Sequence, residues 1–236
     1  LTPRSISKIT LTITGAYSTD KVYDGTTDVN VIGGVLEGIV PGDIVTLSQS
    51  GIYPTKNVGG PYDVVPNFSI SGSASINYIL MQADLAKASI TPRPLSIVGN
   101  TQNKMYDGTD TATLIGGSLS GVVSGEDVVL NLIVKYSSKD AGGPYTITST
   151  STISGADYGD NYTFTQPTLT PRSITKIPLT ITGVMAENKI YDGTRTATLI
   201  LNNPTLNGTI VSGETLTLNS ANVIGTFDTK DVGLNK

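Results

Sequence analysis

A six-residue motif, Lys-x-Tyr-Asp-Gly-Thr, occurs three times in this chain and constrains its fold more than any other feature. Its copies are residues 21–26, 104–109 and 189–194. Glycines that close the preceding apolar segments recur every 84 residues, at positions 15, 99 and 183. A fixed period decides the architecture before local structure does. The 236 residues therefore hold two full repeats and a shortened third.

The length of the period predicts a string of separate domains. A segment of about 50–200 residues can bury its own core, whereas solenoid units of about 20–45 residues depend on their neighbours. We place each start after a Pro-Arg segment, because proline interrupts strand pairing and favours connections. The predicted organisation is a tail of a preceding repeat at 1–8, followed by repeats at 9–92, 93–176 and 177–236, the last of them truncated.

Alternating apolar and polar residues predict that each repeat is built of strands. The alternation is clearest in Leu11–Thr14, Leu95–Val98 and Leu179–Thr182. Further strands are expected at Ile44–Leu47, Val128–Val134 and Leu216–Leu218. Turn signals recur at about the 8–12-residue spacing that is typical of all-β domains. The expected fold is all-β, with tandem small domains that are each a sandwich, a partly open barrel or a β-grasp-like fold.

The connections between repeats, 85–93 and 169–176, are short and contain proline but no Gly/Ser tract. Connections of this kind leave little slack between neighbouring domains. We therefore expect the domains to be strung end to end in an elongated rod of roughly 80–110 Å.

The repeated motif is typical of a structural turn. Glycine accepts a positive φ, and aspartate hydrogen-bonds to its own backbone. The tyrosine ring is expected to pack on its own domain, with the hydroxyl bonded at the edge. An acidic residue also recurs after a Leu-x-Gly segment, as Asp43, Glu126 and Glu214. The predicted structural turn motif comprises Lys21, Tyr23, Asp24, Gly25, Lys104, Tyr106, Asp107, Gly108, Lys189, Tyr191, Asp192 and Gly193.

Composition argues against several classes of function. The chain contains no histidine and no cysteine, which removes the usual general base, the usual zinc ligands and any disulfide. The recurring aspartates lack a second recurring carboxylate nearby, so we expect neither an enzyme nor a cofactor site. The net charge of −4 comes without a basic stripe, which argues against nucleic acid. No apolar run approaches the roughly 20 residues of a membrane span, so no membrane insertion is expected.

A calcium site is the first alternative to a purely structural reading. Asp157, Asp160 and Asn161 form an oxygen-rich cluster in the second repeat. The equivalent residues of the first repeat are Ser73, Ser75 and Ile76. Because the cluster does not recur, the expectation is that the repeat has no metal site.

An intramolecular isopeptide bond is the second alternative. The recurring lysines at 21, 104 and 189 could supply the amine, and Asn77 or Asn161 the carbonyl. The favoured interpretation is that each lysine lays its stem across the tyrosine and keeps its ammonium in water.

The order of motifs resembles a known family. Pro-Leu-Thr-Ile-Thr-Gly (178–183), Lys-x-Tyr-Asp-Gly-Thr, Leu-x-Gly-Val-Val-x-Gly-Asp/Glu, Lys-Asp/Asn-x-Gly, Asn-Tyr and Ile-Thr-Pro-Arg follow one another as in the YDG/MBG-type repeats of large bacterial adhesins, such as filamentous-haemagglutinin-like exoproteins. The similarity covers essentially the whole chain. Departures occur at Pro41, at Ser75-Ile76 and at an insertion near Asn202–Pro204.

The resemblance implies a secreted or surface-anchored, monomeric, mostly-β module that spaces an adhesive tip from a bacterial cell. Its partners would be the neighbouring repeats of the same chain. The alternative is that each repeat itself binds glycan or a host or matrix protein. The family supplies no catalytic residues. No signal peptide is visible, so we expect an interior segment of a longer protein.

Overall fold

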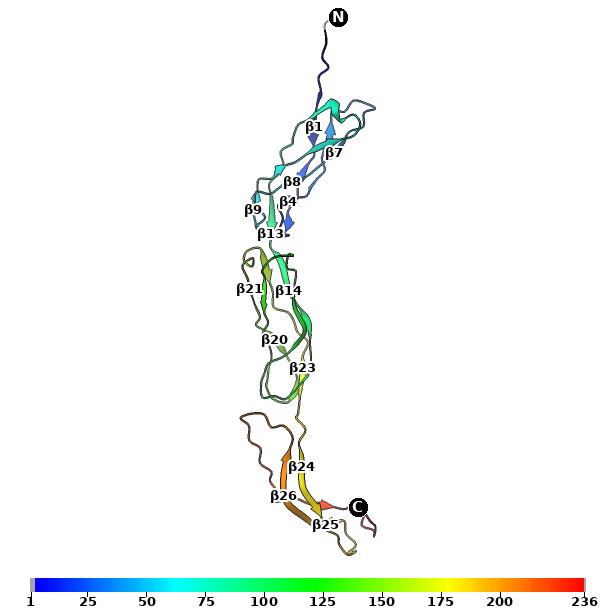
Figure 1. Ribbon diagram of the computed structural model, residues 1–236, viewed down its shortest axis with the longest axis vertical. Coiled ribbons are helices and arrows are strands. Elements are labelled where there is room, and N and C mark those ends of the chain that lie inside the picture. The colour runs from blue at the N-terminus through cyan, green and yellow to red at the C-terminus, as the bar shows by residue number, and fades with distance from the viewer. Residues whose placement is uncertain (1–2, 236) are drawn as a thin grey trace. The chain divides into compact units, whose positions relative to one another are not determined.

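The computed structural model describes residues 3–235 (Figure 1). Backbone contacts divide the chain into two compact units, and each is described by itself. Unit 1 holds the described residues up to Asn100, Gly116–Ile133 and Ser149–Thr168. Unit 2 holds Thr101–Ile115, Val134–Thr148 and the described part of Leu169–Lys236. The division falls inside the second predicted repeat, so each unit contains one junction between neighbouring repeats.

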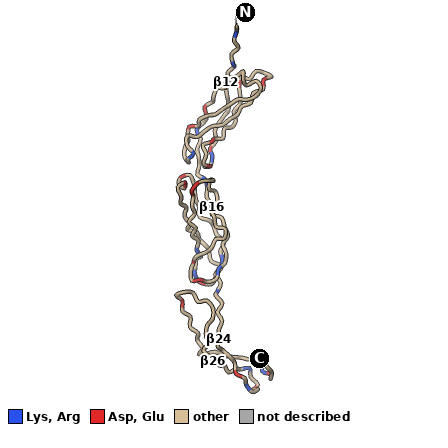
Figure 2. The backbone as a smooth tube through the Cα atoms, viewed as in Figure 1, with Lys and Arg blue, Asp and Glu red and all other residues tan. Residues whose placement is uncertain are grey.

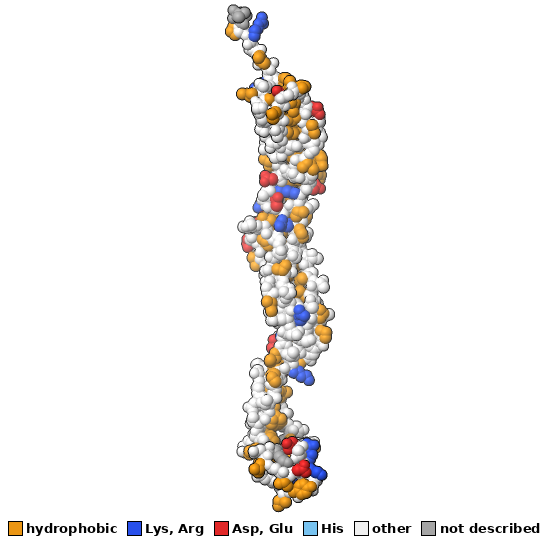
Figure 3. All heavy atoms as spheres, turned by 90° about the vertical axis from the view of Figure 1, so that its right-hand side faces the viewer, with side chains coloured by type: hydrophobic (Ala, Val, Ile, Leu, Met, Phe, Trp, Pro, Cys, Tyr) orange, Lys and Arg blue, Asp and Glu red, His pale blue; other side chains and the backbone are white. Residues whose placement is uncertain are grey.

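The predicted all-β fold of tandem small domains is confirmed. Short strands form small open sheets, and within residues 3–235 the only helical element is the 3₁₀ turn η1 (Ser75–Asn77). In the same range, no helix is long and apolar enough to cross a membrane. In Figure 2, charged residues colour only short stretches of the backbone tube. On the face shown in Figure 3, apolar side chains are scattered among polar and backbone atoms.

The strands of unit 1 form seven small sheets, several of them with only two strands. From the first repeat they are β1 (Ile9–Thr14), β2 (Tyr17–Ser18), β3 (Lys21–Val22), β4 (Asp28–Val29), β5 (Val31–Ile32), β6 (Val35–Glu37), β7 (Thr46–Ser48), β8 (Gly51–Ile52), β9 (Gly59–Tyr62), β10 (Val65–Pro66), β11 (Ser69–Ser71), β12 (Tyr78–Leu80) and β13 (Ala88–Thr91). From the second repeat they are mainly β14 (Arg93–Thr101), β16 (Leu114–Ser120), β17 (Val129–Asn131), β21 (Thr152–Ser154) and β22 (Tyr162–Phe164).

In the sheets of unit 1, the first strand of a repeat pairs with a strand from near the end of the same repeat. β1 lies between β6, antiparallel to it, and β12, parallel to it. β14 likewise lies between β16 and the parallel strand β22. Strand β13 pairs with β3 in parallel and with β9 in antiparallel orientation. Each of the first two repeats is therefore closed by its own C-terminal strands.

The main core of unit 1 is continuous from the first repeat into the second. Its buried members are Tyr23, Val29, Val31, Tyr53, Val64, Phe68, Ala88, Ile90, Leu95 and Tyr162. Leu95 and Tyr162 belong to the second predicted repeat, and the other eight belong to the first. A smaller cluster of Leu11, Ala74 and Tyr78 packs against Leu36, Ile39, Val45, Ile70 and Leu80. The junction between these repeats thus buries apolar surface, which stabilises it at about 25 cal/mol per Å².

The strands of unit 2 come from the rest of the second repeat and from the third. They are β15 (Lys104–Met105), β18 (Val134–Tyr136), β19 (Gly142–Tyr145), β20 (Ile147–Ser149), β23 (Arg172–Thr175), β24 (Thr180–Ala186), β25 (Thr196–Ala197), β26 (Leu199–Asn207) and β27 (Gly225–Thr226). β23 lies between β15 and β19, as β13 lies between β3 and β9 in unit 1. Among the described residues, β24 pairs only with β26.

The structure corrects several predicted strands. Ile44–Leu47 is a strand only from Thr46, and Val128–Val134 is split between β17 and β18. The predicted strand Leu216–Leu218 is absent. Its counterparts β7 and β17 pair with β11 and β21, whereas no segment among residues 3–235 pairs with residues 216–218. A strand without a partner has no ladder to join, so the alternating sequence stays irregular.

The segments predicted to connect the repeats contain strands. Residues 85–93 contain β13 and residues 169–176 contain β23. Proline interrupts each segment only locally, and both strands carry a deeply buried isoleucine, Ile90 or Ile174. These segments therefore hold the last strands of their repeats.

Candidate functional site

The Lys-x-Tyr-Asp-Gly-Thr motif folds into a closed hydrogen-bonded turn. In the first copy, Lys21 Nζ donates to Asp24 Oδ1 at 2.8 Å, to Thr26 O at 2.8 Å and to Thr26 Oγ1 at 2.9 Å. The backbone N–H and the hydroxyl of Thr26 both donate to the same carboxylate oxygen at 2.9 Å. An ammonium has three protons, and this turn uses all of them.

The same turn forms in the other two copies. Lys104 bonds to Asp107 and Thr109, and Lys189 bonds to Asp192 and Thr194, all at 2.7–3.0 Å. Each ammonium also lies over an aromatic ring, at 5.6–5.7 Å from its centroid; these rings are Tyr53, Tyr136 and Phe227. That geometry favours a cation–π interaction.

The lysines differ from the favoured expectation in two ways. The ammonium of Lys21 is hydrogen-bonded inside the turn rather than kept in water, and only 15% of its side chain is exposed. The ring beneath it is Tyr53, not the tyrosine of the motif. The motif tyrosine is not available to the lysine because it points elsewhere, as described below.

The turn carboxylates are held in their charged form. Burial alone would raise the pKa of Asp24, but hydrogen bonds from Lys21 and Thr26 lower it overall. The hydrogen bond from Lys104 lowers the pKa of Asp107. The corresponding bond from Lys189 lowers the pKa of Asp192 to about 2. All three aspartates are therefore ionised near neutral pH and act as acceptors.

The glycine of each turn has a left-handed backbone. Gly25 has φ +78°, and Gly108 and Gly193 both have φ +77°. A Cβ added at Gly108 would lie 2.8 Å from Cγ1 of Val211, whereas one added at Gly193 would meet nothing within 4 Å.

We expect Gly108→Val to lower the free energy of unfolding by about 1–3 kcal/mol, because a β-branched residue is strained at this φ. Gly193→Val is the matched control, since it carries the same φ without the contact to Val211. The difference between the two variants therefore isolates the steric clash. Thermal unfolding measures both, and an unchanged melting temperature for Gly108→Val would contradict the prediction.

The motif tyrosine of the first repeat is buried against the second repeat. Tyr23 is 1% exposed, and its hydroxyl donates to Oε1 of Glu126, which is 103 residues away in the sequence. Its ring makes an edge-to-face contact with Tyr162, with 5.5 Å between the centroids. The expectation that this ring packs only on its own domain is therefore wrong.

Glu126 is the polar centre of this junction. Only 8% of its side chain is exposed, and it accepts hydrogen bonds from Tyr23, Tyr162 and, at 3.4 Å, Lys56. Burial alone would raise its pKa, but the bonds from Tyr162, Tyr23 and Lys56 lower it overall. Burial and the same carboxylate raise the pKa of Tyr162 to about 12. The two tyrosines are thus neutral donors to a buried carboxylate.

A second set of contacts surrounds this centre. Asn161 Oδ1 accepts from the backbone N–H of Val58 at 2.9 Å, and its Nδ2 donates to Asn57 Oδ1 at 3.3 Å. Asn57 and Val58 belong to the recurring Lys-Asn-Val-Gly segment of the first repeat. Arg93 donates to Gly121 O within the second repeat and to Tyr23 O in the first. Polar groups from both repeats therefore pair across the junction.

The same pairing recurs within unit 2. Tyr106 donates its hydroxyl to Oε1 of Glu214, and this bond raises the pKa of the tyrosine. Glu214 is exposed, whereas the side chain of its counterpart Glu126 is only 8% exposed. The third motif tyrosine, Tyr191, is 57% exposed. The three copies of the motif therefore share one turn but differ in what covers the tyrosine.

The lowered pKa of Glu126 predicts how the stability of the junction between the first two repeats changes with pH. The pKa of Glu126 in the folded chain lies below its usual 4.5, so its contribution to stability is complete above that value and is lost as the pH falls through the lowered pKa. We expect the unfolding temperature of unit 1 to fall between about pH 5 and pH 3, and Glu126→Gln to flatten part of that fall. Calorimetry at several pH values measures this. Parallel pH profiles for the two proteins would contradict it.

Several of the residues raised as calcium or isopeptide candidates have other partners in the structure. Asp157 Oδ2 accepts from the backbone N–H of Asp127 at 2.8 Å, and Asn161 bonds to Val58 and Asn57. Within residues 3–235, no three histidine, cysteine, aspartate or glutamate side chains are grouped so that they could hold a metal ion. The turn lysines bond to their own aspartates.

Sequence reasoning did not identify the junction residues Glu126, Tyr162 and Asn161 as a site. The sequence does contain patterns that include them: an acidic residue recurs after each Leu-x-Gly segment, and Asn-Tyr recurs near the end of each full repeat. The long separation along the chain hid these contacts from sequence reasoning, because the bonds from the motif tyrosines Tyr23 and Tyr106 to a glutamate join residues 103 and 108 positions apart.

Comparison with known proteins identifies the family. The YDG domain model matches three consecutive stretches, residues 2–86, 91–169 and 170–236. A search of curated proteins gave no significant match, and neither did a search of solved structures. The matches together cover nearly the whole chain, and the chain therefore belongs to the YDG domain family, of which it carries three tandem copies.

Proposed function

We propose that this chain is a non-enzymatic structural spacer of a bacterial cell-surface or secreted adhesin, which holds an adhesive tip away from the cell. The observation that supports the proposal best is the buried junction of unit 1. There the motif tyrosine of one repeat is fixed to Glu126 and Tyr162 of the next. A spacer must resist bending, and buried, hydrogen-bonded contacts between neighbours limit bending more than a flexible linker does.

One further observation favours a mechanical role over a catalytic one. The recurring polar residues of the motif are used in hydrogen bonds within the chain. Lysine, aspartate and threonine bond to one another in the turn, and the tyrosine of the first copy bonds to Glu126 of the next repeat. The adhesin context and the extracellular location rest on the resemblance to the repeats of large bacterial adhesins.

Small-angle scattering and a glycan array together test the proposal. A spacer is expected to give the scattering of an extended particle, with a radius of gyration well above the ~17–18 Å of a compact chain of this length. It is also expected to bind no glycan on the array. A compact particle would contradict the spacer role. Reproducible micromolar binding to one class of sugar would instead make the repeats the binding module.

A further inference from the structure

The first and last segments of the first repeat run side by side in the same direction. β1 pairs in parallel with β12, with Ile9 opposite Tyr78. Farther along both segments, β3 pairs in parallel with β13, with Lys21 opposite Ile90. The two pairs share one register, because the separation between partners along the chain is the same in both. The beginning and the end of the repeat are therefore joined at two places.

Further hydrogen bonds cross between the same two segments. They are Met81 N–H to Leu11 O, Ser18 Oγ to Ala86 O, Ser89 N–H to Asp20 Oδ1 and Tyr23 N–H to Thr91 O. We call residues 9–23 and 78–91 the terminal overlap of the first repeat. Backbone and side-chain bonds thus connect its two halves along most of their length.

The second repeat has the same overlap, with one part in each unit. In unit 1, β14 pairs in parallel with β22, with Arg93 opposite Tyr162. In unit 2, β15 pairs in parallel with β23, with Lys104 opposite Ile174. Further bonds in unit 2, between residues 69–71 positions apart, are Thr101 Oγ1 to Thr170 O, Arg172 Nε to Thr101 O, Ser173 N–H to Asn103 Oδ1 and Thr175 Oγ1 to Lys104 O.

The direction of the paired strands decides how they respond to a pull on the chain. Tension draws β1 toward its N-terminal end and β12 toward its C-terminal end. Because the two strands are parallel, this pull slides one strand along the other and loads all bonds of the ladder together. An antiparallel hairpin that is pulled at its open end loses its bonds one at a time. The overlap therefore has the geometry in which a short ladder resists tension best.

The overlap also keeps most of the repeat out of the path of the force. Residues 24–77, which contain β4 to β11, lie between the two overlapped segments in the sequence. While the overlap is closed, tension passes across it and does not stretch these residues. Once it opens, they lengthen the chain by about 180–190 Å when fully extended.

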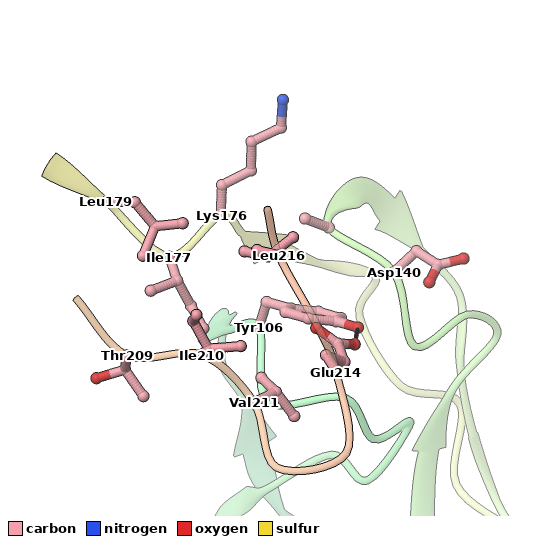
Figure 4. A pocket seen from close by; sticks show the side chains of 11 residues that line it. Tyr106, Asp140, Lys176, Ile177, Leu179, Thr209, Ile210, Val211, Glu214 and Leu216 are labelled. Atoms are coloured by element: carbon pink, nitrogen blue, oxygen red, sulfur yellow. Dashed lines mark hydrogen bonds between the residues drawn. The ribbon is translucent and has the colours of Figure 1, made fainter. Parts of the chain in front are cut away.

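The overlaps of successive repeats are connected by very short segments. Only Pro92 separates β13, the last strand of the first repeat, from β14, the first strand of the second (Figure 1). In unit 2, Tyr106 N–H donates to Thr175 O at 2.8 Å at the end of the second overlap. Lys176 and Ile177, which come next in the chain, line the same pocket as Tyr106 (Figure 4). The motif strands β3 and β15 thus hold the strand by which the chain leaves each repeat.

We propose that the first two repeats are load-bearing links, in which tension along the chain is carried by shear of the parallel strand pairs in the terminal overlaps. This function goes beyond spacing, because a spacer needs stiffness, whereas a load-bearing link stays folded under a pull. It gives the Lys-x-Tyr segment of the motif a task besides the turn, since that segment pairs with the last strand of its repeat. Repeats that bind a glycan would carry load in the same way, so the scattering and glycan tests do not decide this proposal.

Stretching single molecules of the full chain in two directions tests the proposal. The chain has no cysteine, so pairs of introduced cysteines define where the handles attach. Ile6→Cys with Asp84→Cys shears β1 along β12, whereas Ile6→Cys with Ile76→Cys peels the same pair from one end; all three positions are exposed. The mean unfolding force should be at least about twofold higher in shear, since forced unfolding follows the barrier that the pull meets. Equal forces in the two directions would overturn the proposal.

Two proline variants, each pulled from positions 6 and 84, separate resistance to force from stability. Met81→Pro removes the N–H that donates to Leu11 across the overlap, and Met81 is 57% exposed. Asn67→Pro is the matched control, because it removes the N–H of another exposed residue, which donates to Ser50 outside the overlap.

The two variants are expected to lower the melting temperature to a similar degree, because each loses one backbone hydrogen bond. Only Met81→Pro should lower the unfolding force, by roughly half, since only its bond lies in the ladder that the pull shears. A Met81→Pro variant that keeps the force of the unmodified chain would contradict the proposal. So would an Asn67→Pro variant that loses as much force as Met81→Pro.

Discussion

Truncation of Tyr23 to alanine is expected to lower the free energy of unfolding of unit 1 by about 3–5 kcal/mol, the range for loss of a buried aromatic ring. The side chain is 1% exposed and belongs to the main core of the unit. Its removal leaves a cavity beside Tyr162 and deprives Glu126 of a hydrogen-bond donor. Packing and polar pairing are lost together at the same junction.

The chain contains its own control for this experiment. Tyr191 occupies the same place in the third motif but is 57% exposed, so Tyr191→Ala should cost less than about 1 kcal/mol. Tyr23→Phe keeps the ring and removes only the bond to the charged Glu126, which should cost about 1.5–3 kcal/mol. Equal effects of the two alanine variants would show that the junction does not stabilise the unit.

Hydrogen exchange gives a residue-level measurement of the same loss. The N–H of Val58 donates to Asn161 across the junction, so its protection reports the opening of that junction. Protection of this amide should fall by about tenfold for every 1.4 kcal/mol lost. The amide of Tyr106 bonds to Thr175 within unit 2 and should keep its protection, which makes it the internal reference.

Replacement of Glu126 by alanine is expected to be the second most damaging change, with a cost of about 2–4 kcal/mol. The variant leaves the hydroxyls of Tyr23 and Tyr162 without their charged acceptor in a buried setting, and each unsatisfied group costs about 1–3 kcal/mol. The bond to Lys56 adds little, because that lysine is half exposed and pairs in a well-screened position.

Glu214→Ala is the matched comparison. It removes the same type of bond, to Tyr106, but at an exposed site where water replaces the lost acceptor. Its cost should therefore stay below about 1 kcal/mol. Glu126→Gln should lie between the two, since a neutral amide keeps one acceptor oxygen but not the charge. Calorimetric unfolding of the four proteins checks the order; a Glu214→Ala variant as unstable as Glu126→Ala would contradict the role given to burial.

The sequence alone determined the features that depend on neighbouring residues. The three-fold repeat, the all-β class and the first strands at Leu11–Thr14 and Leu95–Val98 were predicted, because alternation and turn chemistry are local properties. The Asp-Gly signal likewise predicted a turn with positive φ at Gly25, Gly108 and Gly193, since only the glycine has to adopt that backbone.

Tertiary structure decided which strands exist and what the tyrosine contacts. Leu216–Leu218 alternates as well as its counterparts but is not a strand, because strand formation needs a partner and no segment among residues 3–235 pairs with it. Tyr23 and Tyr191 stand in the same motif, yet one is buried and the other exposed. Tyr23 is buried because Glu126 and Tyr162 of the following repeat lie against it. The spacing within the motif does not predict this contact, since Glu126 is 103 positions away in the sequence.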